Sequence, residues 1–433
     1  MTIVRPKEFV VDDGDPFERD LLDRKGRVEG LCGLIRDLSA AAVLAVNGPF
    51  GSGKSVFLRM CASHLRSLEV RVAEFNAWHQ SHTKTPLVDL VAAVASSPRF
   101  TEEAARSLRE VAVKLAWRTA SAATRGIVER EDFQSAEGPS RFDDWNQTEE
   151  RRKEFHERLE RIVAQDGKLV VLIDELDRCP PSQALEILDV ARHLFDVPGV
   201  VVVLGINEQE LQHRVKTLYG EGCKAEEFLR RFIDLPVDLP HPGANLAGFM
   251  NEAFASVGLS GRLQAGSDHY SGSLLEILAD KTGMSVRDIQ QFIHRMARVL
   301  ALSPAPEPHD RPGWAVEHLT LALCALRWAD IGAYRKLMAG DIDTAGAAAC
   351  LVGALSLKEQ LAEGDPIVLM AVTALLSLNP DGITTERLVA AGLGDSDTAD
   401  RIRAAYGEQD LNSALLWIGG SRAWLFRLVE LAA

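Results

Sequence analysis

The sequence predicts an α/β protein: a parallel sheet with helices on both faces, followed by an all-helical remainder. Within residues 1–241, short apolar runs alternate with stretches of helical spacing, and strand signals stop after Pro242. Strands joined through helices pair in parallel by right-handed crossovers. Such a sheet binds its ligands at the carboxyl ends of its strands, so the chemistry of the chain is expected there.

Four strands are predicted, and all of them except residues 70–75 are continuous apolar runs, which is typical of parallel strands covered on both faces. They lie at residues 41–46, 70–75, 169–173 and 200–205. A fifth strand is predicted at residues 232–239, where Pro236 cannot donate to a neighbouring strand. This strand is therefore expected at the edge of the sheet.

Helical signals fill the intervals between these strands. Residues 55–68 can place their apolar side chains on one helical face, and residues 182–195 are predicted as a second helix. Ser182, which follows Pro181, is expected to cap this second helix. Residues 86–167 form a long, charged helical insertion without strand character. Two interpretations stay open: a solvated helical pair covering the sheet, or an arm that binds a partner protein.

Changes in composition divide the chain. Residues 1–241 are predicted as the sheet-containing core, with the insertion at about 86–167, and residues 242–302 as a helical lid. Residues 303–312 are rich in proline, which cannot continue a helix, and are predicted as a linker. The Ala- and Leu-rich residues 313–433 are predicted as an α-helical C-terminal domain.

The balance of charge argues against general binding of nucleic acid. The chain has 62 Asp and Glu residues against 48 Lys and Arg residues, which gives a formal net charge of −14. Neutralising a phosphate backbone needs clustered basic side chains. A local basic patch stays open as an alternative at Arg287, Arg295 and Arg298.

A soluble, cytoplasmic chain is expected. The six cysteines are far apart and form no CxxC pair, which is typical of reduced thiols in the cytosol. The first residues are acidic and lack the apolar region of a signal peptide. The longest apolar stretches, residues 345–357 and 366–378, are shorter than the ~18 residues of a membrane span.

One motif points directly to phosphate chemistry. The segment Gly48-Pro-Phe-Gly-Ser-Gly-Lys-Ser55 fits the P-loop pattern G-x-x-x-x-G-K-[ST] and lies between a predicted strand and a predicted helix. Glycines let the backbone turn its N–H groups toward phosphate oxygens, and the helix dipole acts on the same anion. Lys54 is expected to reach the β- and γ-phosphates, and the Ser55 hydroxyl to bind Mg²⁺. The expected nucleotide contacts are Gly48, Pro49, Phe50, Gly51, Ser52, Gly53, Lys54, Ser55 and Val56.

An acidic pair follows the third predicted strand. Asp174 and Glu175 end the apolar run at residues 169–173, an arrangement typical of a Walker B strand. Asp174 is expected to hold Mg²⁺, and Glu175 to polarise the attacking water as a general base. The alternative is a loop start with a merely solvated Glu175. Beside a P-loop, the pair favours hydrolysis over transfer to a small molecule.

Four more residues are candidates for catalysis or nucleotide contact. Asn207, at the end of the fourth predicted strand, either senses the γ-phosphate or caps a helix. Arg230 and Arg231 either supply an arginine finger to a neighbouring subunit or form surface ion pairs. Arg287, in the predicted lid, is a second-sensor candidate.

These elements together resemble the KAP family of P-loop NTPases, within the STAND and AAA-like ATPases. The resemblance covers about residues 10–300. Besides the P-loop, it rests on four segments: Phe75-Asn-Ala-Trp78, Ile173-Asp-Glu-Leu-Asp-Arg-Cys179, residues 228–236 and Val286-Arg-Asp-Ile-Gln-Gln-Phe292. It implies ATP as the nucleotide, and roles in bacterial phage exclusion or signalling for some relatives. Many members carry transmembrane helices in the insertion, whereas the charged side chains of residues 104–131 indicate a soluble member.

The leading hypothesis is an ATP-hydrolysing switch. ATP–Mg²⁺ would bind between the sheet and the helical lid, and hydrolysis would change the lid or the oligomer. A homo-oligomer or a protein partner is expected, and no membrane span. Two alternatives stay open: an ATP-binding interaction module with little turnover, and a small-molecule kinase, against which the acidic pair argues.

Overall fold

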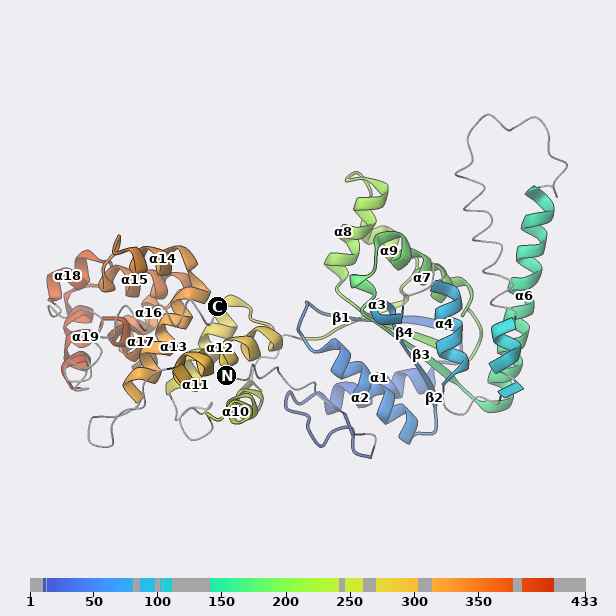
Figure 1. Ribbon diagram of the computed structural model, residues 1–433, viewed down its shortest axis with the longest axis horizontal. Coiled ribbons are helices and arrows are strands. Elements are labelled where there is room, and N and C mark those ends of the chain that lie inside the picture. The colour runs from blue at the N-terminus through green and yellow to red at the C-terminus, as the bar shows by residue number, and fades with distance from the viewer. Residues whose placement is uncertain are drawn as a thin grey trace. The chain divides into compact units, whose positions relative to one another are not determined.

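The computed structural model describes residues 11–12, 14–80, 86–97, 102–103, 105–110, 141–240, 246–259, 270–302, 314–376 and 384–408. The chain forms two compact units (Figure 1). One unit is Glu8–Pro240 and contains the sheet; the other is His241–Ala433 together with Met1–Lys7.

The sheet has five parallel strands in the order β2-β3-β4-β1-β5. They are β1 Ala42–Asn47, β2 Arg71–Asn76, β3 Leu169–Asp174, β4 Val200–Ile206 and β5 Leu235–Asp238. All five predicted strands are present, and the predicted fold class is confirmed. The proline-containing β5 lies at one edge, as expected, because Pro236 has no N–H to give to a further strand.

Helices cover both faces of the sheet, because successive side chains of each strand point to opposite sides. Leu44 and Val46 pack in one hydrophobic cluster with helices α1 and α2, while Val43 and Ala45 pack in another with α4 and α6 to α9. Figure 1 shows these two layers. The helices of this unit are α1 Lys25–Asp37, α2 Lys54–Ser67, α3 Ala77–Gln80, α4 Pro86–Ala95, α6 Arg141–Asp166, η1 Leu176–Arg178 (a 3-10 helix), α7 Pro181–His193, α8 Glu208–Tyr219 and α9 Ala225–Leu229.

The described part of the insertion packs on the sheet. Phe155 and Leu159 of α6 are fully buried, and Leu90 and Val91 of α4 share their hydrophobic cluster. This packing agrees with the interpretation of the insertion as a cover for the sheet. Residues 111–140 of the insertion lie outside the described residues.

The predicted cap of the helix after β3 is wrong. Helix α7 begins at Pro181, its N-cap residue is Pro180, and no side chain caps it. Proline suits the first helical position, because its fixed φ matches the helix and its missing N–H would have no partner there. Ser182 therefore lies inside the first turn.

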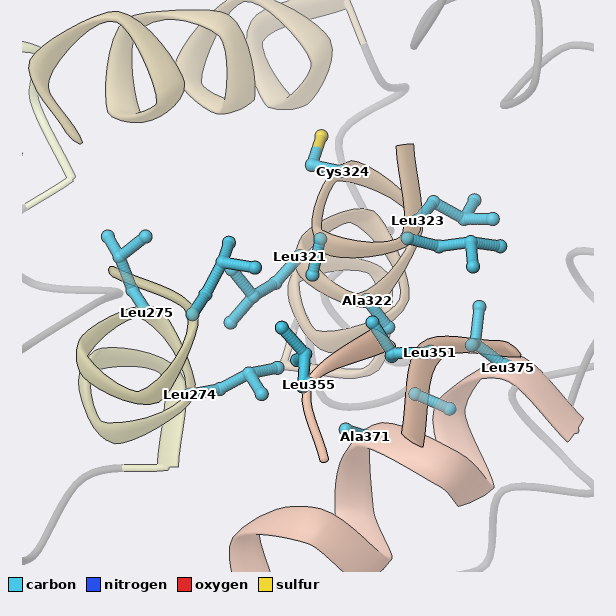
Figure 2. Packing of buried hydrophobic residues seen from close by; sticks show 14 of the residues in the cluster. Leu274, Leu275, Leu321, Ala322, Leu323, Cys324, Leu351, Leu355, Ala371 and Leu375 are labelled. Carbon is cyan, nitrogen blue, oxygen red and sulfur yellow. The ribbon is translucent and has the colours of Figure 1, made fainter. Parts of the chain in front are cut away.

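The second unit is helical throughout its described residues. Its helices are α10 Leu246–Ser256, α11 Tyr270–Thr282, α12 Val286–Leu302, α13 Trp314–Ala329, α14 Ile331–Ala339, α15 Thr344–Ala354, α16 Lys358–Glu363, α17 Pro366–Leu376, α18 Thr385–Ala390 and α19 Ser396–Glu408. Helices from both sides of the Pro-rich residues 303–312 contribute to one hydrophobic core. Figure 2 shows members of this core from four helices: Leu274 of α11, Leu321 of α13, Leu351 of α15 and Leu375 of α17. The division into a lid and a C-terminal domain stays a prediction, and residues 303–312 lie outside the described residues.

In the part of the chain that the structure describes, no helix is both long enough and apolar enough to cross a bilayer.

Candidate active site

The loop between β1 and α2 has the backbone that the glycine pattern predicts. Gly51 and Gly53 have φ angles of 78° and 87°, in the left-handed region that favours glycine. The N–H of Gly48 donates to the carbonyl of Ile206 on β4 at 3.1 Å, which ties the loop to the carboxyl end of the sheet. Helix α2 then begins at Lys54, and no side chain caps it. Its first N–H groups therefore point out of the helix end without a side-chain acceptor.

Two features of this loop fit an anion such as phosphate. Ser52 is 2% exposed, and its Oγ has no hydrogen-bond partner in the structure. A Cβ on Gly48 would lie 2.8 Å from that oxygen, so Gly48 leaves room for the hydroxyl. A buried polar atom without a partner is costly, and a ligand that accepts its hydrogen bond would remove the cost. The uncapped start of α2 favours the same kind of ligand.

Lys54 lies across the loop. It is 8% exposed, and its Nζ donates to the carbonyl oxygens of Gly48 at 2.7 Å and Pro49 at 3.1 Å. The ammonium also lies 5.7 Å from the ring centroid of Phe50. Its positive charge is thus held directly beside the loop.

The two residues predicted to hold Mg²⁺ lie close together. The Ser55 side chain, on the first turn of α2, lies close enough to the Asp174 carboxylate at the end of β3 to lower the pKa of that carboxyl by hydrogen bonding. The N–H of Glu175 donates to Asp174 Oδ1 at 2.8 Å. A Cβ on Gly205 of β4 would lie 2.8 Å from the same oxygen, so this glycine makes room for the carboxylate. A hydroxyl and a carboxylate are hard oxygen ligands of the kind Mg²⁺ takes, usually together with water and phosphate oxygens.

Burial changes the protonation of this carboxyl. Desolvation raises the pKa of Asp174, and Glu175 raises it further, while the Ser55 hydroxyl, the Glu175 amide and Lys54 oppose the shift. A cation bound between Ser55 and Asp174 would favour the ionised carboxylate that a metal ligand requires.

Glu175 is held in a specific orientation. Its φ is 58°, a left-handed conformation that is uncommon for a residue other than glycine and costs free energy. Its Oε2 accepts a hydrogen bond from Nδ2 of Asn76 at 3.2 Å, and its Oε1 lies 3.1 Å from Nη2 of Arg178. The other side-chain atom of Asn76, Oδ1, accepts from the N–H of His79 at 2.9 Å. This second bond fixes which end of the amide faces Glu175.

Sequence reasoning missed the contribution of Asn76. The segment Phe75-Asn-Ala-Trp78 was informative only as a family resemblance. The available signal was the position of Asn76 at the end of a parallel strand, in register with Asp174 on the neighbouring strand. Polar residues at such strand ends face the ligand edge of the sheet.

A second buried acid supports the site. Asp177 is 2% exposed, and its Oδ2 accepts from the N–H of Asn207 at 2.9 Å. Burial raises the pKa of Asp177, and the nearby charge of Lys54 is the largest opposing effect. Asp177 thus joins the segment after β3 to the end of β4. The sequence alone did not reveal this contact.

Asn207 acts as a helix cap. It precedes α8, and its Oδ1 accepts from the N–H of Glu210 at 3.4 Å. The structure therefore agrees with the structural alternative for this residue. A role toward the γ-phosphate stays a prediction.

Within the sheet-containing unit, Arg230 and Arg231 do not take part in these contacts. Arg230 pairs with Glu226 on the exposed surface of α9, and Arg231 is also exposed. Within the described part of the chain, neither arginine has a hydrogen bond or ion pair with residues 48–56. Arg287 is exposed in the first turn of α12, in the helical unit. Finger and sensor roles for these residues stay predictions.

A model of the KAP family P-loop domain matches residues 28–302, which is more than half of the chain. The chain belongs to the KAP family. The resemblance inferred from the motifs is thereby confirmed, and the match begins before β1 and extends to the end of α12.

Individual relatives of this KAP-family chain match it only over a short segment or at low sequence identity. The phage T7 exclusion protein of Escherichia coli (strain K12) is 32% identical over 85 residues, which span 19% of this chain and 11% of that protein. The Aeropyrum pernix ORC2 protein, in ADPNP–ADP complexes, is 12% identical with a TM-score of 0.36, over 92% of this chain and 98% of its own. AMPPCP-bound DnaA from Aquifex aeolicus is 12% identical with a TM-score of 0.31, over 97% of this chain and 96% of its own. Scores this low add nothing to the fold that the sheet itself shows.

Proposed function

We propose that this KAP-family chain binds ATP with Mg²⁺ and hydrolyses it. The observation that carries the proposal is the proximity of the Ser55 and Asp174 side chains, beside a loop in which Gly51 and Gly53 have left-handed backbones. It joins a phosphate cradle, two metal-binding oxygens and an adjacent carboxylate, Glu175, at one end of the sheet. Few reactions other than phosphoryl chemistry need this combination.

Each residue has a distinct role in the proposed reaction. The N–H groups at the start of α2 and the ammonium of Lys54 bind and orient the β- and γ-phosphates. Ser55 and Asp174 would hold Mg²⁺, which would neutralise phosphate charge when bound. Glu175 orients a water toward the γ-phosphorus and accepts its proton, while the bond from that phosphorus to the β–γ bridging oxygen breaks. ADP and inorganic phosphate are the products.

The interaction module with little turnover is the second candidate. Both oxygens of Glu175 already have donors, from Asn76 and Arg178. The ion pair with Arg178 competes with an attacking water for this carboxylate, whereas the Asn76 amide orients it. We therefore propose a low basal rate, and a rearrangement that separates Arg178 from Glu175 and raises this rate. This coupling would make the chain a nucleotide-driven switch.

The biological setting is also part of the proposal. The similarity to the phage T7 exclusion protein, although limited to 19% of this chain, supports a role in bacterial defence or signalling. The six free cysteines support a cytoplasmic location. We further propose that the chain assembles into a homo-oligomer or with a protein partner, and that Arg231 then acts on a neighbouring site.

Phosphate release by the full chain tests this function. Wild type should release phosphate only when Mg²⁺ is present. E175Q should lose about a hundredfold or more in kcat but keep its affinity for ATP. K54A should no longer bind ATP. Glu157, exposed on α6, provides the matched control E157Q, which should behave as wild type. Tight binding without turnover would favour the interaction module. Labelled phosphate found on a small molecule would favour a kinase, and no binding at all would refute the proposal.

A further inference from the structure

A buried arginine lies behind the P-loop. Arg24 precedes α1 and is 5% exposed. Its Nη1 donates to the carbonyl oxygen of Gly53 at 2.9 Å, and its Nη2 donates to that of Ser52. The donors of a guanidinium form a rigid planar fork, so one side chain fixes two consecutive peptide groups.

These two carbonyls determine where the following amides point. The peptide bonds are trans, and in a trans peptide the C=O and the next N–H point in opposite directions. Holding the oxygens of Ser52 and Gly53 toward Arg24 therefore turns the N–H groups of Gly53 and Lys54 away from it. These N–H groups stand at the start of α2, where a phosphate would bind.

Gly53 fits this contact in two ways. Its φ of 87° is easily reached only by glycine, and a Cβ there would lie 2.8 Å from Nη1 of Arg24. The P-loop glycine thus admits the arginine as well as the backbone turn. Burial lowers the pKa of Arg24 to about 10, with Asp20 opposing the shift, so the guanidinium stays charged at neutral pH.

Two positively charged side chains hydrogen-bond to opposite halves of the loop. Lys54 donates to the carbonyls of Gly48 and Pro49, whereas Arg24 donates to those of Ser52 and Gly53. In the proposed function, Lys54 turns to the phosphates when nucleotide binds. Arg24 lies on the carbonyl side of the loop, so its contacts persist.

We propose that Arg24 is a positioning residue for the phosphate cradle. It presets the N–H groups of Gly53 and Lys54 and places a buried positive charge behind them, without touching the nucleotide. The inference rests on the proposed function, since it assumes that the loop binds phosphate. These amides serve the phosphate groups that ATP and ADP share. The loss of Arg24 should therefore weaken the binding of ATP and of ADP by similar factors and change kcat little.

The test compares R24Q and R24K with wild type in the full chain. R24Q removes the charge and the fork; R24K keeps the charge but not the fork. Arg27 is exposed three residues further along the chain, so R27Q is the matched control. We expect R24Q to raise the Kd for both ATP and ADP by about tenfold to hundredfold, as for a lost hydrogen bond to a charged group. R24K should lie between R24Q and wild type, and R27Q within about twofold of wild type.

Hydrogen exchange of the P-loop peptide, without nucleotide, gives an independent readout. It should become at least several-fold faster in R24Q and R24K but stay unchanged in R27Q. Thermal melting shows whether each variant folds. If R24Q does not fold, the hydrogen exchange of the P-loop peptide in R24K is the deciding measurement. Exchange in R24K as slow as in wild type would overturn the proposal. Unchanged Kd values and exchange in folded R24Q also overturn it. Failure of wild type to bind ATP refutes the proposed function instead.

Discussion

The side-chain amide of Asn76 donates a hydrogen bond to Oε2 of Glu175 at 3.2 Å, across the ends of two neighbouring strands. Nη2 of Arg178 lies 3.1 Å from the other oxygen, Oε1. The carboxylate proposed as general base therefore has a fixed orientation and a donor at each of its two oxygens. Both effects bear on turnover, and neither changes the loop that would bind phosphate.

Replacing Asn76 by alanine should slow turnover without weakening nucleotide binding. Arg178 would then hold Glu175 alone and draw it away from its present position. We expect kcat to fall by about tenfold to hundredfold, the range for a lost hydrogen bond to a charged group, with the Kd for ATP within about twofold. Phosphate release and calorimetry measure the two quantities. In an E175Q background, N76A should have no further effect on single-turnover rates, and a further fall would place the action of Asn76 elsewhere.

Gly205 should be required for the metal site as well as for packing. A Cβ there would lie 2.8 Å from Oδ1 of Asp174 and 2.7 Å from Cδ1 of Leu58. G205A should displace the carboxylate and lower the apparent affinity for Mg²⁺ in the presence of ATP by about tenfold. The added methyl should also cost about 1–3 kcal/mol of folding free energy.

The control for this change is Gly222. It has no heavy atom within 4 Å of a built Cβ and lies in the same unit. G222A should leave Mg²⁺ dependence and melting temperature near those of wild type. Equal Mg²⁺ dependence in G205A and G222A would mean that Asp174 is not a metal ligand.

The P-loop and the strands could be predicted because their signals are local. A run such as residues 200–205 is apolar and short, as a covered strand is, and the glycine spacing of residues 48–53 directly follows the strand predicted at residues 41–46. Residue types and spacing within a few positions determine these features. The wrong cap at Ser182 shows the limit, since Pro181 took the first helical position instead.

The contacts that support the site could not be predicted in this way. Asn76 and Glu175 are 99 residues apart in the chain, and Arg24 is 29 residues from Gly53. Such pairs depend on the order of the strands and on the packing of α1 against α2, which no local pattern specifies. An arginine before a helix is otherwise a common surface feature, and only its burial distinguishes Arg24.

Arg230 and Arg231 offer a paired test of assembly. Arg230 has an ion-pair partner in its own chain, Glu226, and both arginines are exposed. If a neighbouring subunit receives Arg231, R231A should lower kcat about a thousandfold in the assembled state, with ATP affinity nearly unchanged. The kcat of R230A should stay within about twofold of wild type, because an exposed ion pair contributes little free energy. Light scattering must show the assembly; unchanged turnover of R231A in that state would remove the finger proposal.

The raised pKa of Asp174 predicts how stability depends on pH. Burial favours the protonated carboxyl in the folded, nucleotide-free chain. Its stabilising contribution is complete below the pKa of an unfolded aspartate and is lost as pH rises through the higher folded-state pKa. D174N cannot titrate, so the melting temperature of wild type relative to D174N should fall on going from about pH 4 to pH 7. Adding Mg²⁺ and ATP should reverse this trend in wild type alone, because metal binding requires the ionised carboxylate. Parallel melting curves of the two proteins at every pH, with and without ligand, would contradict both the shifted titration and the metal role.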